Sequence, residues 1–269
     1  MRTYFLLIAF FSFSFLQSYS QEKDMAVMED SLSHYGKDMF ASISEPVRLE
    51  NNFAFINALV EALKNKNSFD YSFSRLDMIS ILTDPDSTFR VFSWNIPLND
   101  GSYLFYGSIQ FRTPSGELKL LPLLDKTFEI ENPQTEILSS DKWYGAQYYD
   151  IIPIKDFYIL LGWKGHSKDY TQKVIEILTI DEDSVQLGKA VFLENEKWTR
   201  RVFNYTRQAS MYLRYHPEEK QIYFDHIAPL KEELKGEYKY YGPDLSHDAY
   251  EIKNDKLEFK EDVELRNEN

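Results

Sequence analysis

From Phe89 to the end of the chain, short runs of residues alternate between apolar and polar side chains, and turn residues separate the runs. The run at 89–96 is followed by NDG (99–101), and the run at 103–111 is followed by PSG (114–116). Alternation with a period of two is typical of strands, and Asn, Gly and Pro accept the backbone geometry of tight turns. Loops this short join antiparallel strands, because a parallel crossover needs about a dozen residues. The pattern predicts a mainly β fold: an antiparallel meander in a sandwich, an open barrel or a propeller-like sheet.

The segment before this meander has helical spacing instead. Residues 22–42 and 50–66 carry apolar side chains three and four positions apart, which is typical of amphipathic helices. The sequence predicts one or two N-terminal helices packed on the sheet. The side chains expected to be buried against it are those of Phe53, Ile56, Leu59 and Leu63.

The first twenty residues resemble a secretion signal. Arg2 precedes an apolar stretch at residues 4–15, and Ser18 and Ser20 are small residues before Gln21. The apolar stretch is shorter than the roughly 20 residues that a spanning helix needs. We therefore expect cleavage after Ser20, export to the periplasm or the extracellular space, and no stable membrane insertion after cleavage.

The predicted organisation has three parts. Residues 1–20 form the signal peptide, residues 21–85 an N-terminal helical segment, and residues 86–269 an antiparallel β domain. Hydrophobic residues make up 43% of the chain, so a packed core is expected rather than disorder. There is no cysteine, so disulfides and cysteine-bound metals are excluded.

The charge of the chain limits its partners. The formal net charge is −13 at pH 7, which repels nucleic acid at long range. We expect an unknown glycan, peptide or envelope protein as the partner, and no nucleic acid.

One short motif suggests catalysis and has a simpler interpretation. Asp84, Asp86 and Thr88 form the D-x-D-x-T pattern that opens a haloacid-dehalogenase-type phosphatase site. That chemistry uses the first Asp as nucleophile and needs a parallel α/β sheet. The segments after Thr88 are predicted to form antiparallel hairpins, so no such sheet is expected. An EF-hand calcium loop would need Gly and Glu where Phe89 and Asn95 stand. The motif is therefore predicted to be a turn in which Asp84 binds backbone N–H groups, and no metal or other cofactor is expected.

No other pattern predicts a catalytic residue. The five histidines lack the spacing of a metal-binding pair on one helix face, and no G-x-S-x-G nucleophile motif occurs. Glycosidase carboxylates meet only in space, so a local search cannot detect them. A hydrolase acting on a glycan or peptide with carboxylates from separate strands, such as Asp150, Asp156 or Asp225, is the alternative interpretation.

Aromatic residues are the one compositional excess, with 19 Tyr, 20 Phe and 4 Trp. Most of these rings are expected in the half-buried faces of the sheet. Two pairs fall in turn-rich segments, where rings have fewer core neighbours, and these pairs are expected to form an exposed platform for a ligand. We predict that Trp143, Tyr144, Tyr240 and Tyr241 bind a ligand, in a non-catalytic exported or envelope-associated module whose ligand is a glycan or a peptide.

Several stretches carry a resemblance to known sequences. These are DPDSTFRVFSWNIPLNDGSYLFYGSIQF, with FYILLGW at 157–163, LGKAVF at 187–192, and SYS before Gln21. Over about residues 75–195 the chain resembles a group of uncharacterised exported proteins of Bacteroidota-type bacteria. The resemblance implies export and carries no activity, site or cofactor.

Overall fold

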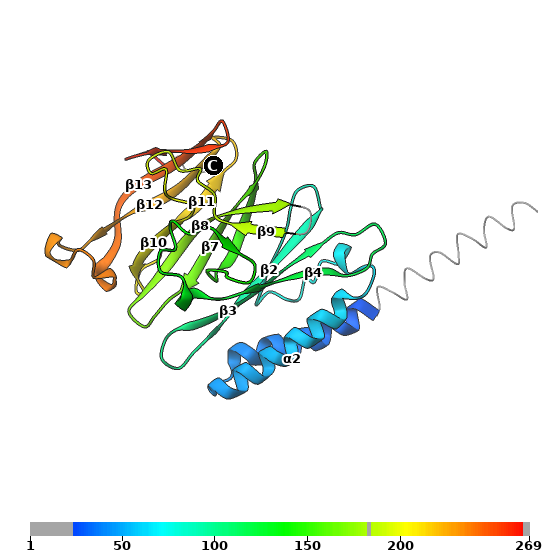
Figure 1. The fold of residues 1–269 in the computed structure, drawn as a ribbon. Helices are drawn as coiled ribbons and strands as arrows, with labels where there is room; N and C mark the ends of the chain where they lie inside the picture. Colours follow the sequence, from blue (N-terminus) through cyan, green and yellow to red (C-terminus); the bar gives the residue numbers. More distant parts are fainter. Residues whose placement is uncertain (1–23, 182–183, 266–269) are drawn as a thin grey trace, which may run out of the picture. The chain divides into compact units, whose positions relative to one another are not determined.

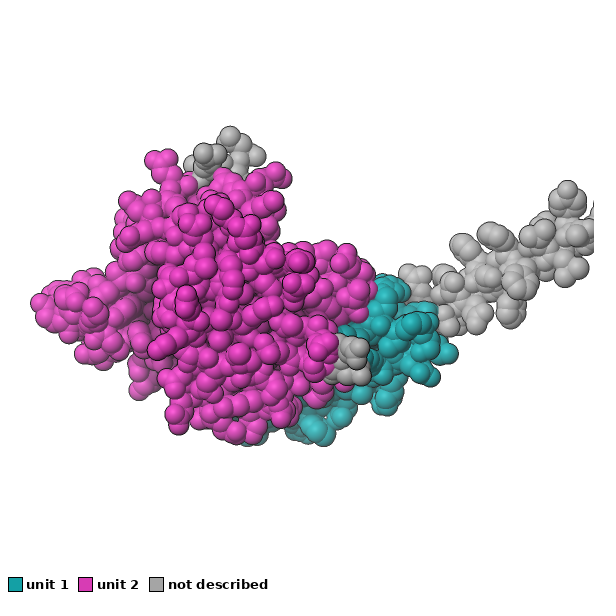
Figure 2. All heavy atoms as spheres, turned by 45° about the horizontal axis from the view of Figure 1, so that its top comes forward, with its two compact units in different colours: residues 1–78, 110–119 teal, residues 79–109, 120–269 magenta. Residues whose placement is uncertain are grey.

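The computed structural model describes residues 24–181 and 184–265 (Figure 1). The predicted signal peptide, residues 1–20, lies outside the described residues. The described residues form two compact units, one within residues 1–78 and 110–119 and one within residues 79–109 and 120–269 (Figure 2). None of the helices in the described ranges is both long enough and apolar enough to cross a membrane.

The first unit contains two helices, at residues 24–41 and at α2 (Glu45–Leu63), and the short 3-10 helix η1 (Ser68–Asp70). Pro46 in the first turn of α2 suits a position whose N–H has no partner inside the helix. The buried side of α2 includes Phe55, Leu59 and Leu63, whereas Phe53 is 68% exposed. The predicted stripe was therefore wrong at Phe53, which lies two residues from Phe55 and so on another side of the helix.

Buried polar contacts tie the first unit together. The carboxylate of Glu29 accepts hydrogen bonds from the Tyr71 hydroxyl at 2.7 Å and from the Arg75 backbone N–H at 2.8 Å. The buried Gln110 amide donates to the Ser68 hydroxyl at 3.1 Å. Every one of these buried groups has a partner, as a stable interior requires.

The remaining chain is built of three antiparallel sheets. The first has the order β1-β2-β3-β4, the second β5-β9-β8-β7-β6 with β10 also paired to β8, and the third β11-β12-β13-β14. Their strands are β1 (Ser80–Thr83), β2 (Phe89–Pro97), β3 (Tyr103–Phe111), β4 (Lys119–Leu124), β5 (Leu138–Ser139), β6 (Gln147–Pro153), β7 (Tyr158–Gly165), β8 (Tyr170–Asp181), β9 (Ser184–Leu187), β10 (Arg201–Thr206), β11 (Leu213–His216), β12 (Gln221–Pro229), β13 (Tyr241–Lys253) and β14 (Lys256–Lys260). Single 3-10 turns occur at η2 (Thr127–Glu129), η3 (Glu232–Leu234) and η4 (Tyr238–Tyr240). The prediction of a mainly β, antiparallel fold preceded by helices is confirmed.

The apolar core of the second unit lies between the second and third sheets. Alternate residues of β7 and β8, such as Ile159 and Ile175, meet Phe224 of β12 and Tyr250 of β13 in one buried cluster. Period-two alternation along each strand places these side chains on one face. The two sheets are therefore held together by the residues that alternate in the sequence.

The turn at Asp84 is as the sequence predicts. Asp84 is buried, and its Oδ1 accepts from the backbone N–H groups of Thr88 at 2.7 Å and Phe89 at 2.8 Å. Its Oδ2 accepts from the Asp86 N–H at 3.2 Å and the Thr88 hydroxyl at 3.1 Å. Both carboxylate oxygens are thus occupied by the turn itself.

Candidate functional site

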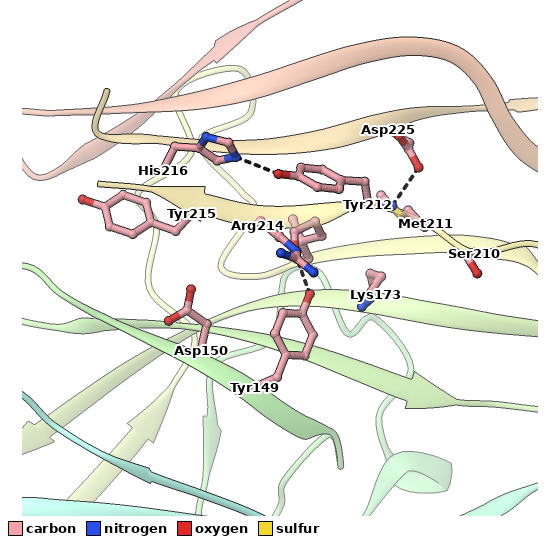
Figure 3. Close-up of a pocket in the computed structure, with 11 residues that line it drawn as sticks. Tyr149, Asp150, Lys173, Ser210, Met211, Tyr212, Arg214, Tyr215, His216 and Asp225 are labelled. Atoms are coloured by element: carbon pink, nitrogen blue, oxygen red, sulfur yellow. Dashed lines mark hydrogen bonds between the residues drawn. The ribbon is translucent and has the colours of Figure 1, made fainter. Parts of the chain in front are cut away.

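A groove of about 890 Å³ opens where the core between the second and third sheets ends (Figure 3). Residues of β6 and β8 form one side, and residues of β11, β12 and the segment before β11 form the other. In Figure 3, Tyr149 and Lys173 from the second sheet face Tyr212 and Arg214. We call this feature the Lys173 groove.

The groove arises from the strand pattern. On β8, Ile177 and Ile175 belong to the core, and the next residue on the same face is Lys173. On β6, Ile152 belongs to the core. Asp150, two residues before it on the same face, lies opposite Leu161 of β7. Charged residues thus occupy positions where the alternation would place apolar ones, and the core gives way to a polar hollow.

Two cations in the groove have no anionic partner among the described residues. The Lys173 ammonium lies 4.2 Å from the centre of the Tyr149 ring, and the Arg214 guanidinium lies 5.7 Å from the centre of the Tyr212 ring. Within the described part of the chain, neither side chain forms an ion pair or a hydrogen bond. Burial, with a smaller contribution from the Arg214 guanidinium, lowers the pKa of Lys173 to about 8. The two cations therefore repel each other across the groove.

The two carboxylates of the groove differ in how they are bonded. Asp150 is half-buried, and its Oδ1 accepts from the N–H of Ile151 at 2.9 Å. Burial raises the pKa of Asp150. Asp225 accepts from the Tyr212 N–H at 2.7 Å and lies 3.3 Å from Nε2 of His247. Asp225 therefore serves the local structure, and Asp150 is the less constrained of the two.

The aromatic rings of the groove are fixed in place. Tyr149 is 38% exposed, and its hydroxyl donates to the carbonyl of Leu213 at 2.9 Å. The Tyr212 hydroxyl lies 2.7 Å from Nε2 of the buried His216. Rings held at their polar end need little reordering when a ligand packs on their faces.

The groove continues along β8 into a second hollow of about 370 Å³. The two hollows share Lys173, Ser210 and Met211. The second also has Trp163 of β7 and Arg207, whose Nη2 donates to the Tyr103 hydroxyl at 2.8 Å. A further cation and a further ring thus extend the same surface.

The structure does not support exposure of the first predicted aromatic pair. Trp143 is 0% exposed, and its Nε1 donates to the Tyr148 hydroxyl at 2.9 Å. Tyr144 is 5% exposed, and its hydroxyl donates to Oε1 of Gln172 at 3.0 Å. The prediction that these two rings lie in an exposed platform is wrong, because both reach back from their turn into the interior.

The second predicted pair has a different setting. Tyr240 is exposed, and Tyr240 and Tyr241 line a hollow of about 470 Å³ beside Pro229 at the junction of β12 and β13. The Tyr241 hydroxyl accepts from the Gly236 N–H at 2.9 Å. Ligand binding by this pair stays a prediction, and the pair lies apart from the residues that line the Lys173 groove.

Sequence reasoning found part of the groove and missed the rest. Asp150 and Asp225, named as carboxylates from separate strands, both line it, whereas Asp156 is exposed in the turn between β6 and β7. The cations Lys173 and Arg214 were missed. A signal for Lys173 was present, because it interrupts the apolar alternation of β8 at a position that continues the core face.

Comparison with known protein families, with curated proteins and with solved structures finds no match. The resemblance to exported proteins of Bacteroidota-type bacteria therefore stays a prediction. In the part of the chain that the structure describes, no group of three or more His, Cys, Asp or Glu side chains could hold a metal ion.

Proposed function

We propose that the protein is an exported, non-catalytic binding module that holds a segment of a glycan in the Lys173 groove. The observation that carries the proposal is a preformed groove in which anchored tyrosine rings lie beside two cations that have no ion-pair partner among the described residues. Ligand sites are concave, combine ring or apolar surface with a few polar groups, and are largely formed before binding.

The lining suits sugar rings. The C–H groups on one face of a sugar carry slight positive charge and pack on the electron-rich face of an aromatic ring. Tyr149 and Tyr215 offer such faces, and Ser210 and Asp150 offer polar groups to sugar hydroxyls. A ligand with both apolar faces and many hydroxyls is therefore the best fit to this mixture.

A peptide added as an extra strand fits less well. β6 and β11 stand at the ends of their sheets, and such edges can pair with an extended peptide. The β6 edge is irregular, however, because its register shifts between Tyr148 and Asp150. On β11, the Leu213 carbonyl already accepts from Tyr149. Both edges are thus impaired as templates for strand addition.

Export is part of the proposal and rests on residues 1–20. A cysteine-free chain with a cleavable signal suits a compartment outside the cytoplasm, whatever its redox state. Intact-mass measurement of protein released by its native host should give a chain that begins at Gln21. Retention of residues 1–20 in the released protein would contradict export by cleavage.

The binding proposal is tested by affinity electrophoresis in gels that contain soluble polysaccharides, neutral and acidic. At least one polysaccharide should retard the wild type, and Tyr149→Ala and Tyr215→Ala should migrate faster than the wild type in the same gel. Phe128→Ala is the matched control, because Phe128 is almost fully exposed and lies outside the groove. Equal retardation of all four proteins, or of none, would contradict the proposal.

A hydrolase is the second candidate function, because Asp150 and Asp225 come from separate strands and line one groove. Burial raises the pKa of Asp150, as a general acid requires. The bonds of Asp225 to Tyr212 and His247 are the argument against it. Release of reducing ends from a bound polysaccharide, abolished by Asp150→Asn, would establish the hydrolase in place of the binding module.

A further inference from the structure

The Lys173 groove and the adjoining hollow carry more cations than carboxylates, whereas the chain as a whole is acidic. The formal net charge is −13, yet Lys173, Arg214 and, in the adjoining hollow, Arg207 line one continuous surface. None of these three side chains forms an ion pair within the described residues. By contrast, other cations such as Arg75 and Lys260 are each paired with a carboxylate. The groove is thus a local concentration of unpaired positive charge on an acidic protein.

The groups that face Lys173 do not neutralise it. They are Tyr149 and Asp150 of β6, Tyr205 of β10, Arg207, and Arg214 of β11. Burial raises the pKa of Tyr205 to about 12, so its hydroxyl stays neutral at physiological pH. Burial also raises the pKa of Asp150, and no cation contributes to that pKa. Asp225 is bonded to Tyr212 and His247. Lys173 is therefore repelled by Arg214 and lies over the face of the Tyr149 ring, and it forms no salt bridge with any described residue.

We infer that the Lys173 groove selects an anionic glycan, and that an acidic group of one sugar, a carboxylate or a sulfate, is seated between Lys173 and Arg214. This inference rests on the proposed function and specifies its ligand. An arginine fork can bind two oxygens of such a group, and a lysine adds a point charge from the opposite side. The neighbouring sugar faces would then pack on Tyr149 and Tyr215. An anion in this place relieves the repulsion between the two cations.

The inference predicts a pH dependence with a definite sign. An anion favours the charged form of Lys173, so binding raises the pKa of Lys173 above its free value of about 8. Affinity should be level below pH 7 and fall by up to about tenfold per pH unit above pH 8. Lys173→Arg should keep the affinity and lose this decline, because arginine stays protonated throughout the range.

The closing experiment is isothermal titration calorimetry on the chain that begins at Gln21, at constant ionic strength. The probes are polygalacturonate and its methyl ester, dextran sulfate and dextran, and poly-L-glutamate. Wild type should bind polygalacturonate or dextran sulfate at least about tenfold more tightly than the uncharged counterpart. Whichever acidic probe binds identifies carboxylate or sulfate as the group. Lys173→Met and Arg214→Met should each weaken that binding at least about tenfold, the loss expected for one charge-assisted contact.

Lys189→Met is the matched control. Its ammonium also lies over a ring, 4.9 Å from the centre of Phe157, but Lys189 does not line the groove. Its removal changes the net charge equally and should leave affinity within about twofold of the wild type. A loss in Lys189→Met as large as in Lys173→Met would show general charge attraction and overturn the inference.

The remaining outcomes separate the inference from the proposed function. Equal affinity for charged and uncharged glycans, unchanged by Lys173→Met, would leave glycan binding standing and overturn the anionic preference. Poly-L-glutamate binding as tightly as polygalacturonate would overturn the assignment to a sugar. Binding to none of the five probes would contradict both.

Discussion

Lys164 and Lys173 lie on neighbouring strands of one sheet and on opposite faces of it. In the register of β7 and β8, Lys164 pairs with Gln172 and Lys173 with Trp163. Burial lowers the pKa of Lys164 to about 7 and contributes most to the lowering of the pKa of Lys173 to about 8. Both ammonium groups are thus in surroundings that disfavour their charge.

The two lysines differ in their partners. Lys164 is 1% exposed and donates to the Thr127 hydroxyl and to the Gly145 carbonyl, each at 2.8 Å, between the rings of Phe105 and Tyr144. Within the described residues Lys173 forms no hydrogen bond or ion pair, and its ammonium lies over the Tyr149 ring at the groove. A polar group whose hydrogen bonds are made to the protein stabilises the fold. One that makes no such hydrogen bond is available to a ligand.

The largest effect is expected on the face of the second sheet that carries Lys164. There Arg200 and Glu176 form a fully buried pair, with Nε and Oε2 2.5 Å apart. Arg200→Ala leaves a buried carboxylate without its cation and should lower the free energy of unfolding by about 3–5 kcal/mol. Arg214→Ala, in the Lys173 groove, should change the free energy of unfolding by no more than about 0.5 kcal/mol. Urea unfolding of both variants measures the difference. Similar losses of stability in the two would contradict the distinction between cations that stabilise the fold and cations available to a ligand.

Lys164 predicts a pH dependence of stability. The pKa of Lys164 is about 7 in the folded chain and 10.5 without burial, so the unfolded chain binds more protons between these values. The free energy of unfolding should therefore rise with pH in this window, by about 4 kcal/mol in total. Lys164→Met should lack this part of the rise. Urea unfolding at pH 7 and pH 9 checks it, and parallel curves for variant and wild type would count against a buried, weakly basic Lys164.

Asp84 and Asp150 repeat the comparison with carboxylates. Asp84→Ala removes four hydrogen bonds from the turn before β2 and should cost about 2 kcal/mol, as lost side-chain caps do. Asp150→Ala should cost less, because among the described residues the Asp150 carboxylate is bonded only to the N–H of Ile151. Thermal unfolding compares the two. Added Mg²⁺ or Ca²⁺ should leave the wild-type Tm unchanged, and a metal-dependent rise that is lost in Asp84→Ala would contradict the assignment to a turn.

The smallest effect on stability is expected for Lys173 itself. Lys173→Met removes a partly desolvated charge and keeps the contact of its side chain with the Tyr149 ring. The free energy of unfolding should change by about 0.5 kcal/mol or less, and in the direction of higher stability at pH 7. Chemical unfolding measures this change. A loss of more than 1 kcal/mol, about twice the expected limit, would indicate that Lys173 holds the fold together.

Features that depend on neighbours in the sequence could be predicted. The strands follow from alternation, and the turn follows from Asp84 and Thr88, which are four residues apart and bond to each other. The helical stripe was correct at Leu59 and Leu63 and wrong at Phe53, because several apolar residues compete for the buried face of α2 and spacing alone does not choose among them.

Features that depend on residues far apart could not be predicted. Lys173 and Arg214 become neighbours only when β8 and β11 come together, and neither lies in a motif. Trp143 was placed on the surface because its segment is rich in turn residues, yet its long side chain reaches Tyr148 in the interior. Sequence alone shows where a turn is, and the fold decides whether a ring in it faces water.

The most direct test of the account follows the Nζ or Cε resonances of Lys164 and Lys173 by NMR as pH is varied. The free protein should show a Lys173 pKa of about 8 and a Lys164 pKa of about 7. With saturating oligogalacturonate or a sulfated oligosaccharide, the pKa of Lys173 should rise by about one unit or more, the shift expected beside a close anion. The pKa of Lys164 should stay where it was. A Lys173 pKa near 10.5 in the free protein, or one that does not move with either ligand, would contradict the claim that this groove binds an anionic glycan.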